Sequence, residues 1–437
     1  MRSRALTVLL PLLAVSLHAE VKVLKNFTLI DGTGRAPAPN SAMIIDAGRI
    51  SWVGPAAQLK APAGAEAIDL TGKFVMPGII NLHGHLGATI DLQQSADNLT
   101  AANLERNLKT YASYGVTTVL SMGTDKDLVL AMRDKQRATG RPGETRIYSA
   151  GHGFIYKGGY GGLVGVNEGV STPAEVSKQL DMLASQKVDI VKLWIDDHLG
   201  EIKLKMPDEI SKAIIEGAHR RNLPAASHIF YLADAKKVTE YGVNGLAHSV
   251  RDQAVDQALI DSMKKHGTWQ LAATLSREAS MFAYGHTPSF ASDPFFTRGV
   301  SQNVVRTLKS PEYQKAQAAD PHFAHYPEYL ETAKKNLKRL ADAGVKYGFG
   351  TDSGPPGRFP GYLEHWEMEL MVEAGLTPSQ VIQAATKSGA EFLRAKDLGT
   401  LETSKWADLI VLDKNPLDNI RNSRTIQAVY IAGNRIR

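Results

Sequence analysis

Two histidines one residue apart form the sharpest chemical signal in the sequence. His83 and His85 follow the apolar run 75–80, within Asn81-Leu82-His83-Gly84-His85. In a strand, residues i and i+2 point to the same face, so both imidazoles can face one centre. Imidazole nitrogens bind zinc and similar first-row ions. A His-x-His pair also occurs by chance, so it indicates a metal site only together with further ligands.

Three more side chains of the metal-binding kind follow other apolar runs. His228, His248 and Asp352 each come directly after such a run. A lone histidine there is more often structural, and Asp352 before Ser353-Gly354 also fits an Asx turn or a helix cap. Two histidines at equivalent points of successive β/α units are a stronger pattern. Asp352 could bind metal and also accept a proton from an attacking water.

Lys192 lies inside an otherwise apolar strand candidate, residues 188–194. A charged lysine is costly there unless something pairs with it. One solution is reaction with carbon dioxide, which gives an anionic carbamate able to bridge two metal ions. The other is a side chain that reaches the strand end or pairs with Asp196 or Asp197. The residues alone leave both open.

The elements that must position these residues alternate between strand and helix from residue 77 to about 394. Eight strand candidates lie at 78–82, 116–121, 146–150, 190–194, 224–227, 245–247, 268–272 and 347–350. Helical runs lie between most of them, at 104–114, 173–186, 207–221 and 234–241. Eight such units predict an α/β fold, a closed parallel (β/α)8 barrel of the TIM type. A doubly wound open sheet is the alternative, but no Gly-rich phosphate loop follows the first strand.

The barrel would bring the candidate ligands together. They fall at the C-terminal ends of predicted strands one, four, five, six and eight: His83, His85, Lys192, His228, His248 and Asp352. Active sites of barrel enzymes lie at this end. The sequence therefore predicts a metal centre there.

Both ends of the chain carry short β-like runs punctuated by Gly and Pro. We expect residues 20–76 and 395–437 to fold together into a small β-sandwich beside the barrel of residues 77–394. The connection 274–343, between strands seven and eight, is long and rich in aromatic residues. It could be a lid or binding loop, or equally an oligomer contact or a packed surface excursion.

The composition is that of an ordinary globular protein, with 43% apolar and 22% charged residues in 437. The net charge is +5 and no block of five or six Lys or Arg occurs, which argues against nucleic-acid binding. There is no cysteine, so disulfides and thiolate ligands are excluded. Any metal site must use His and oxygen ligands.

The N-terminus predicts a secretory signal peptide over residues 1–19. Arg2 and Arg4 precede the apolar stretch 6–17, and Ala19 is a small residue at a cleavage point. Twelve residues are too few to cross a bilayer, which needs about 20. We therefore expect export to the periplasm or the medium and no stable membrane span. The alternative is a buried N-terminal helix.

The pattern resembles the amidohydrolase superfamily, in the group named after imidazolonepropionase. The resemblance covers essentially the whole chain after the signal segment. It rests on Met76–His85, Ile190–Lys192, His228, His248, Gly350–Gly354 and the tail Leu398–Asp413. Lys192 makes the chain more similar to that group's two-metal prolidase-like peptidases and N-acyl-amino-acid amidases, because imidazolonepropionase uses one metal and lacks this lysine.

The resemblance implies a role for each candidate. His83 and His85 would bind the more buried of two divalent ions, expected to be zinc. His228 and His248 would bind the other ion. Carboxylated Lys192 would bridge both ions, and catalytic Asp352 would bind metal, act as general base and then protonate the leaving amine.

One position departs from the resemblance. Relatives often have His-x-Tyr at the fifth strand, with the Tyr holding substrate, whereas Phe230 stands here and Tyr231 follows it. Loop position makes four more residues candidates for the substrate pocket: His152, Tyr156, Tyr160 and Arg358. Arg358 could pair with a substrate carboxylate or equally face solvent.

Together these features predict an exported metal-dependent amidohydrolase that cleaves amide or peptide bonds of dipeptides or N-acyl amino acids. A lactonase or organophosphate hydrolase is an alternative, because activated water attacks other electrophiles too. A non-catalytic binding protein of the same fold is a third reading, although it would not need Asp352. The likeness of fold does not settle the substrate, and a homo-oligomer stays open.

Overall fold

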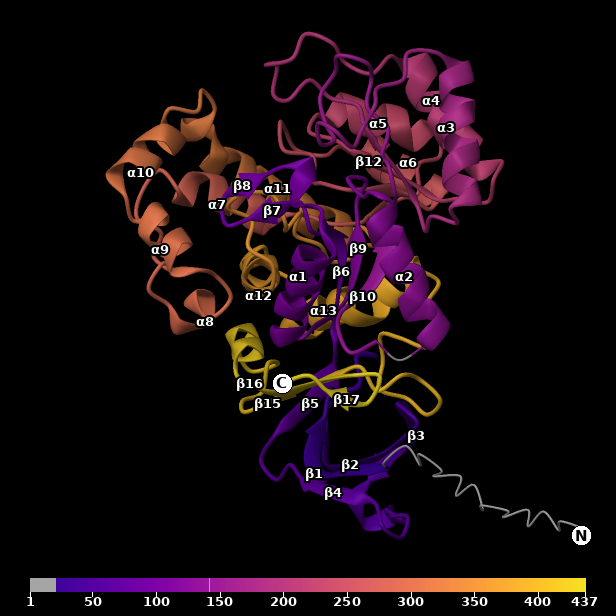
Figure 1. Cartoon of the computed structure of the whole chain (residues 1–437), viewed down its shortest axis with the longest axis vertical. Helices are drawn as coiled ribbons and strands as arrows, with labels where there is room; N and C mark the ends of the chain where they lie inside the picture. The colour runs from indigo at the N-terminus through magenta and orange to yellow at the C-terminus, as the bar shows by residue number, and fades with distance from the viewer. Residues whose placement is uncertain (1–20, 141) are drawn as a thin grey trace, which may run out of the picture.

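The structure is a computed structural model that describes residues 21–140 and 142–437. The predicted signal peptide, residues 1–19, lies outside the described residues. Figure 1 shows two parts: a sheet that holds both ends of the described chain, and a larger α/β part above it. Within the described ranges, no helix combines the length and the apolar character that crossing a bilayer requires.

Eight strands from the two ends of the chain form one mixed sheet, in the order β17-β16-β15-β5-β1-β2-β3 with β4 beside β1. These strands are β1 (Lys22–Leu29), β2 (Ala38–Asp46), β3 (Arg49–Pro55), β4 (Glu66–Asp69), β5 (Phe74–Pro77), β15 (Leu409–Leu412), β16 (Ile426–Ile431) and β17 (Asn434–Arg435). The expected partnership of the two ends is made by β15, which pairs antiparallel with both β5 and β16. The β-sandwich itself and the proposed domain limits stay predictions.

Seven short parallel strands form the centre of the larger part. One sheet contains β6 (Ile79–Gly84), β9 (Val116–Ser121) and β10 (Arg146–Ser149). The other contains β11 (Val191–Trp194), β12 (Ala225–His228), β13 (Gly245–Leu246) and β14 (Trp269–Gln270). Almost every residue in them is buried, which is why they read as continuous apolar runs.

The prediction of an eighth strand at residues 347–350 is wrong. Residues 347–350 form only an isolated bridge, at Tyr347, although their backbone bonds to both sheets. The Gly348 N–H donates to a β14 carbonyl at 3.0 Å, and the Phe349 carbonyl accepts from a β6 N–H at 2.8 Å. The bonds to β14 all go to Gln270, the last residue of that short strand, so the pairing stops after one bridge and no ladder forms.

A second irregular segment joins the two sheets on the other side. Phe154, after β10, donates from its N–H to the Lys192 carbonyl at 2.7 Å and accepts from the Trp194 N–H at 3.0 Å. Backbone hydrogen bonds of two irregular segments therefore link the two sheets on both sides. Closure of a barrel stays a prediction, because the parallel strands form two sheets of three and four strands.

The helices of the central part follow its strands. They are α1 (Ala101–Ser113), α2 (Asp127–Thr139), α3 (Pro173–Ser185), α4 (Asp208–His219), α5 (Leu232–Glu240) and α6 (Gln257–His266). The predicted start of α3 is confirmed: Thr172 accepts from the Glu175 N–H, Pro173 takes the first position, and the Glu175 side chain completes a capping box.

The connection 274–343 is mostly helical. It contains α7 (Leu275–Ala283), α8 (Pro294–Thr297), α9 (Gln302–Leu308), α10 (Pro311–Ala318), the 3-10 turn η3 (Phe323–His325) and α11 (Tyr326–Asp342). Helices α8 to α10 project to one side of the molecule (Figure 1). They have an apolar core of their own, centred on Phe290, Phe296 and Leu308, that also includes Tyr362.

The remaining elements complete the chain. They are the hairpin β7 (Thr89–Ile90) and β8 (Gln93–Gln94), the short turns η1 (Ala56–Gln58), η2 (Ala96–Asn98) and η5 (Ile420–Arg424), helices α12 (Tyr362–Glu373), α13 (Pro378–Gln383) and α14 (Gly389–Phe392), and the π-helix η4 (Ala384–Ser388). Helix α12 packs against α7, which matters for the site described next.

Candidate active site

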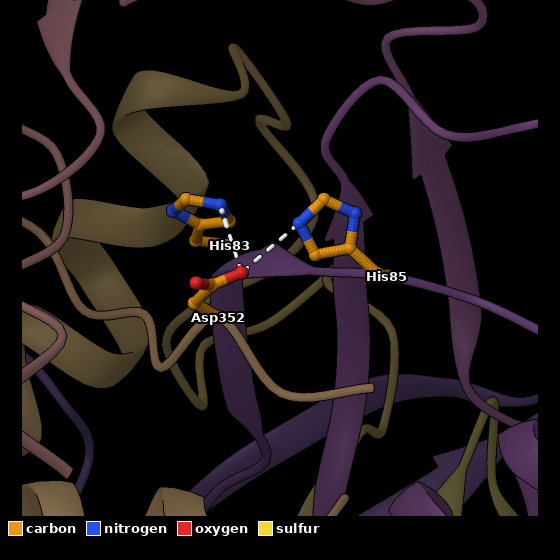
Figure 2. A group of neighbouring side chains, drawn as sticks. All are labelled: His83, His85 and Asp352. Atoms are coloured by element: carbon orange, nitrogen blue, oxygen red, sulfur yellow. Dashed lines mark ion pairs between the residues drawn. The ribbon is translucent and has the colours of Figure 1, made fainter. Parts of the chain in front are cut away.

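Three of the six candidate ligands meet at the end of β6. His83 lies in β6, His85 follows it, and Asp352 lies in the loop after residue 350. The Nε2 atoms of His85 and His83 are 3.0 and 3.5 Å from Oδ1 of Asp352, as the dashed lines in Figure 2 show. One ligand atom from each residue lies within 4.8 Å of the others. Ligands bonded to one ion at about 2.0–2.2 Å lie this close together.

The other three candidates extend this group across to the second sheet. The ring centroid of His248 is 4.7 Å from that of His83 and 4.2 Å from that of His228. Lys192, on β11, interacts electrostatically with these three imidazoles and with Asp352. Ring and ion-pair contacts therefore join five of the six residues, and Lys192 lies on β11, which pairs with the strand β12 that ends at His228.

Three of the histidines are oriented by a hydrogen bond on Nδ1. These bonds join His83 to the Ala247 carbonyl (2.9 Å), His85 to Thr124 Oγ1 (2.8 Å) and His248 to Thr274 Oγ1 (2.9 Å). Each bond orients its ring, and the carbonyl partner of His83 requires an N–H on Nδ1, which leaves His83 Nε2 as the electron donor, the usual arrangement around a bound metal.

Two buried polar atoms of the group have no hydrogen-bond partner within residues 21–140 and 142–437. They are His83 Nε2 and Lys192 Nζ, on side chains that are both fully buried. Buried polar groups without a partner are rare because they lose their hydration. A divalent cation would supply the missing interaction for His83. This donor set of imidazoles and a carboxylate therefore fits a metal ion.

Burial also sets the charge of these groups. It lowers the pKa of His228 to about 4, although the Asp196 carboxylate opposes the shift. It lowers the pKa of His83 and His248 well below the ordinary value. Burial lowers the pKa of Lys192 to about 7, against the opposing effect of nearby carboxylates. Neutral imidazoles are the form that binds metal.

Asp352 is held in an unusual way for a non-glycine residue. Its φ is 58°, in the left-handed region. Its Oδ2 accepts from Arg358 Nη1 at 2.5 Å and lies 3.1 Å from Arg277 Nε. Burial alone would raise its pKa, but Arg358 and the His83 and His85 imidazoles hold the pKa well below the usual value. Asp352 is thus an ionised carboxylate, able to accept a proton.

The sequence reasoning missed a set of charged residues around the centre. Arg277 and Arg251 are buried and share the buried Glu278, which is 3.3 Å from Arg251 Nε. Asp196 Oδ2 is 3.0 Å from His228 Nε2. Glu278 and the two arginines lie on α7 or in a loop, outside the strand ends on which the motifs lie. The sequence did carry one signal for these residues, the adjacent opposite charges of Arg277 and Glu278 in a segment that also contains apolar residues.

The predicted substrate residues are placed unequally. Arg358 contacts Asp352 directly and also lines a cavity of about 380 Å³ between α1 and the α8–α9 connection. The Tyr231 hydroxyl donates to Asp197 Oδ1 at 2.9 Å, one residue beyond Asp196. The Tyr160 ring, a further candidate, is 5.3 Å from that of His228.

The remaining two substrate candidates lie near segments that lead to the site. The backbone of His152 forms an isolated β-bridge with Thr124, the residue that orients His85. The backbone of Tyr156 forms another with Val170. No contact in the described part of the chain joins either side chain to the six candidate ligands.

Comparison with known proteins agrees with this geometry. The chain is 23% identical over 401 residues to imidazolonepropionase of Streptomyces griseus, covering 91% of each protein. A crystal structure of a Xaa-Pro dipeptidase with bound methionine has a TM-score of 0.73 at 22% identity, covering 95% of this chain and 99% of that one. Ochratoxinase of A. niger has a TM-score of 0.74 at 18% identity, covering 96% of both chains. At these identities the structural likeness shows the fold.

The family profile gives the assignment. The Amidohydrolase family matches residues 74–436, which is most of the chain and includes all six candidate ligands. The protein therefore belongs to the amidohydrolase family and is a hydrolase that acts on carbon–nitrogen bonds.

Proposed function

We propose that this protein hydrolyses the amide or peptide bond of small substrates that carry a carboxylate, such as dipeptides or N-acyl amino acids, with water activated at a two-metal centre. The observation that carries the proposal is the convergence of His83, His85 and Asp352 on one point, with a buried and unpartnered nitrogen of His83 beside them. The strand ends that hold them would belong to a (β/α)8 barrel.

The ligands divide between two ions. His83 and His85 would hold one ion, and His228 and His248 the other, with Asp352 as a further ligand. Lys192 would bridge them after its neutral amine adds carbon dioxide, forming an N–C bond and releasing one proton. Its buried Nζ without a partner supports this role. Zinc is the proposed ion because the donors are nitrogen and oxygen.

The chain's own residues then move the proton. Bound divalent ions supply a Lewis acid that lowers the pKa of water and polarises a carbonyl. Asp352, ionised and accepting from Arg358, takes the proton of the attacking water and passes it to the leaving amine. Proton transfer of this kind contributes about 10²–10⁴-fold to a rate. Burial of the surrounding imidazoles excludes competing water.

A substrate carboxylate is favoured by the charges around Asp352. Three guanidinium groups, of Arg251, Arg277 and Arg358, share two carboxylates, of Glu278 and Asp352. Arg358 also lines a cavity beside Asp352, so its guanidinium could bind an anionic group there, because guanidinium recognises carboxylates with two donors. The Xaa-Pro dipeptidase and ochratoxinase among the structural neighbours lend this substrate class further support.

The pocket side chains are proposed in two groups. Arg358, Tyr160 and Tyr231 would contact the substrate, because they adjoin Asp352, His228 and Asp197 respectively. His152 and Tyr156 would line the approach to the site.

The test is a hydrolysis screen with matched substrates on the full chain. Dipeptides and N-acyl amino acids should be cleaved, and the corresponding primary amides, which lack the carboxylate, should show a kcat/KM at least about tenfold lower. Elemental analysis should find close to two divalent ions per chain, and a chelator should abolish turnover until metal is restored. Turnover of lactones or phosphotriesters without any amide cleavage would overturn the proposal.

We also propose that the protein is exported to the periplasm or the medium. Arg2, Arg4 and the apolar stretch 6–17 support this destination. Protein recovered outside the cytoplasm should begin after Ala19. Full-length protein confined to the cytoplasm would contradict the proposal.

A further inference from the structure

Helix α12 carries two carboxylates that point into the protein. Glu364 and Glu367 are one helical turn apart, and both are 0% exposed. Residues three apart lie on the same face of a helix. Neither pairs with a Lys or Arg among the described residues, and both bind backbone or neutral polar groups. Such groups are costly to bury, so their partners indicate their role.

Glu364 holds the loop of Asp352. Its Oε1 accepts from Thr351 Oγ1 at 2.9 Å and from Ser353 Oγ at 2.7 Å, the residues on either side of Asp352. The same oxygen accepts from Asn81 Nδ2 at 2.6 Å. Asn81 Oδ1 in turn accepts from the His83 N–H at 2.8 Å. One carboxylate thus connects the segments that carry His83 and Asp352.

Glu367 holds the start of α7. Its two oxygens accept from the Leu275 N–H at 2.9 Å and the Ser276 N–H at 2.7 Å. The residue before them, Thr274, gives no side-chain cap to this helix and instead bonds His248 Nδ1 at 2.9 Å. The same helix carries Arg277. Glu367 therefore replaces the missing helix cap and leaves the Thr274 hydroxyl to orient His248.

The two segments share a conformational feature. Thr274 and Asp352 both have φ in the left-handed region, at 54° and 58°. This conformation is uncommon for residues with a side chain and persists only where the surroundings fix it. Glu367 binds the two backbone amides that follow Thr274, and Glu364 binds the hydroxyls on either side of Asp352.

We propose that Glu364 and Glu367 are positioning residues that hold the two halves of the metal site, one around Asp352 and His83 and the other around His248, at a fixed spacing through one rigid helix. This inference rests on the metal centre of the proposed function. It assigns neither residue a contact with metal or substrate.

The experiment measures metal affinity, by competition with a chelator, together with kcat and KM on the full chain. Glu364→Gln and Glu367→Gln keep the shape of the side chain. Each replaces one carboxylate oxygen, which accepts hydrogen bonds, by an NH₂ group, which would face the N–H or O–H donors of its neighbours. Loss of such an outer partner lowers metal affinity or activity about 10–100-fold. We expect each variant to lose within this range in metal affinity and kcat, with KM changed less than twofold.

The matched control lies on the same helix. Glu369→Gln breaks the ion pair of Glu369 Oε1 with Arg424 Nη2, which is 2.5 Å long and not connected to the site. It should lower the unfolding midpoint while leaving metal affinity and kcat unchanged.

Second variants keep the inference testable if a glutamine variant does not fold. Ser353→Ala removes one donor to Glu364 and should weaken metal binding in the same direction. Thr274→Ala should do so for the other half, whereas Thr274→Ser, which keeps the hydroxyl, should not.

One result would overturn the positioning role, and a different result would overturn the proposed function. Metal affinity and kcat within twofold of the wild type in Glu364→Gln and Glu367→Gln, or an equal loss in Glu369→Gln, would overturn the positioning role. A wild-type protein that binds no divalent ion would instead overturn the proposed function, and the premise of this inference with it.

Discussion

Lys192 differs from the other candidate ligands because it must change chemically before it can bind a cation. Its amine is fully buried, has no hydrogen-bond partner and lies 4.9 Å from the centroid of the Trp194 ring. The alternative was an ion pair of Lys192 with Asp196 or Asp197. No such pair is present among the described contacts, because Asp196 is paired with His228 and Asp197 accepts a hydrogen bond from Tyr231. The missing pair is consistent with the carbamate proposed above for Lys192.

The first prediction concerns this residue. Lys192→Ala should lower the metal content from about two ions to one or fewer and reduce kcat/KM by about 10³-fold or more, because the bridge between the ions is lost. Elemental analysis and steady-state kinetics measure both. Lys109→Ala, at an exposed ion pair on α1, is the control. An unaltered metal count in Lys192→Ala would remove the bridge hypothesis.

The second prediction concerns Asp352. Asp352→Asn keeps the shape but cannot accept a proton, so kcat should fall about 10²–10⁴-fold. Single-turnover kinetics would show that chemistry, and not product release, has slowed. Asp413→Asn, at an exposed ion pair with Lys73 on the end sheet, is the control. A kcat unchanged in Asp352→Asn would exclude it as the base.

At the level of single residues, the sequence predicted the candidate metal ligands better than the residues that hold those ligands in place. A His-x-His pair and a lysine in an apolar strand are visible locally, because each is anomalous in its own segment. In the sequence, Glu364 and Glu367 look like ordinary glutamates of a helix. Only the fold shows that both are buried and bound to the site.

Seven of the eight predicted central strands are present in the structure, and the four predicted helical runs are present as α1, α3, α4 and α5. The signals at Thr172 and Pro173 place the start of α3, because capping depends on a few adjacent residues. The eighth strand failed for the opposite reason. Residues 347–350 have a strand-like sequence, but whether they form a ladder depends on two partners from remote segments.

The third prediction concerns the helical connection 274–343. Phe296 is fully buried in the core that α8 and α9 share with Tyr362. Phe296→Ala should destabilise this region by about 3–5 kcal/mol through cavity formation. Hydrogen exchange should rise in α8 to α10 while metal content stays unchanged. Faster exchange spread evenly over the central strands would show instead that the connection does not unfold as a separate unit.

The two parts of the molecule are joined by a partly buried ion pair. Arg146, at the start of β10, contacts both carboxylate oxygens of Asp408, at 2.7 and 3.2 Å. Asp408 precedes β15 of the end sheet, and its Oδ1 also accepts from the Ala432 N–H at 2.6 Å. Its backbone carbonyl accepts from the Gly78 N–H at 2.9 Å. One residue of the C-terminal segment therefore contacts both Arg146, in the third central strand, and Gly78, directly before the first.

The fourth prediction tests this connection. Asp408→Asn should cost about 1.5–3 kcal/mol, the usual contribution of a hydrogen bond to a charged group. The loss should appear as an earlier unfolding step of the end sheet in calorimetry, with the metal centre still intact. Arg35→Gln, at an exposed pair with Asp31, provides the comparison. A single transition shifted no more than in that control would show that the pair does not couple the two parts.

The sequence by itself determined the kinds of side chain available for chemistry, the succession of strands and helices, and membership of a family that places such residues at strand ends. These features depend on residue type and short-range spacing, which the chain carries in linear order. Only the tertiary structure decided that Arg251, Arg277 and Glu278 surround the centre, that residues 347–350 bond to two sheets without forming a strand, and that α12 holds both halves of the site. Those outcomes depend on contacts between residues up to several hundred positions apart, and no local pattern encodes which partner a buried charge will find.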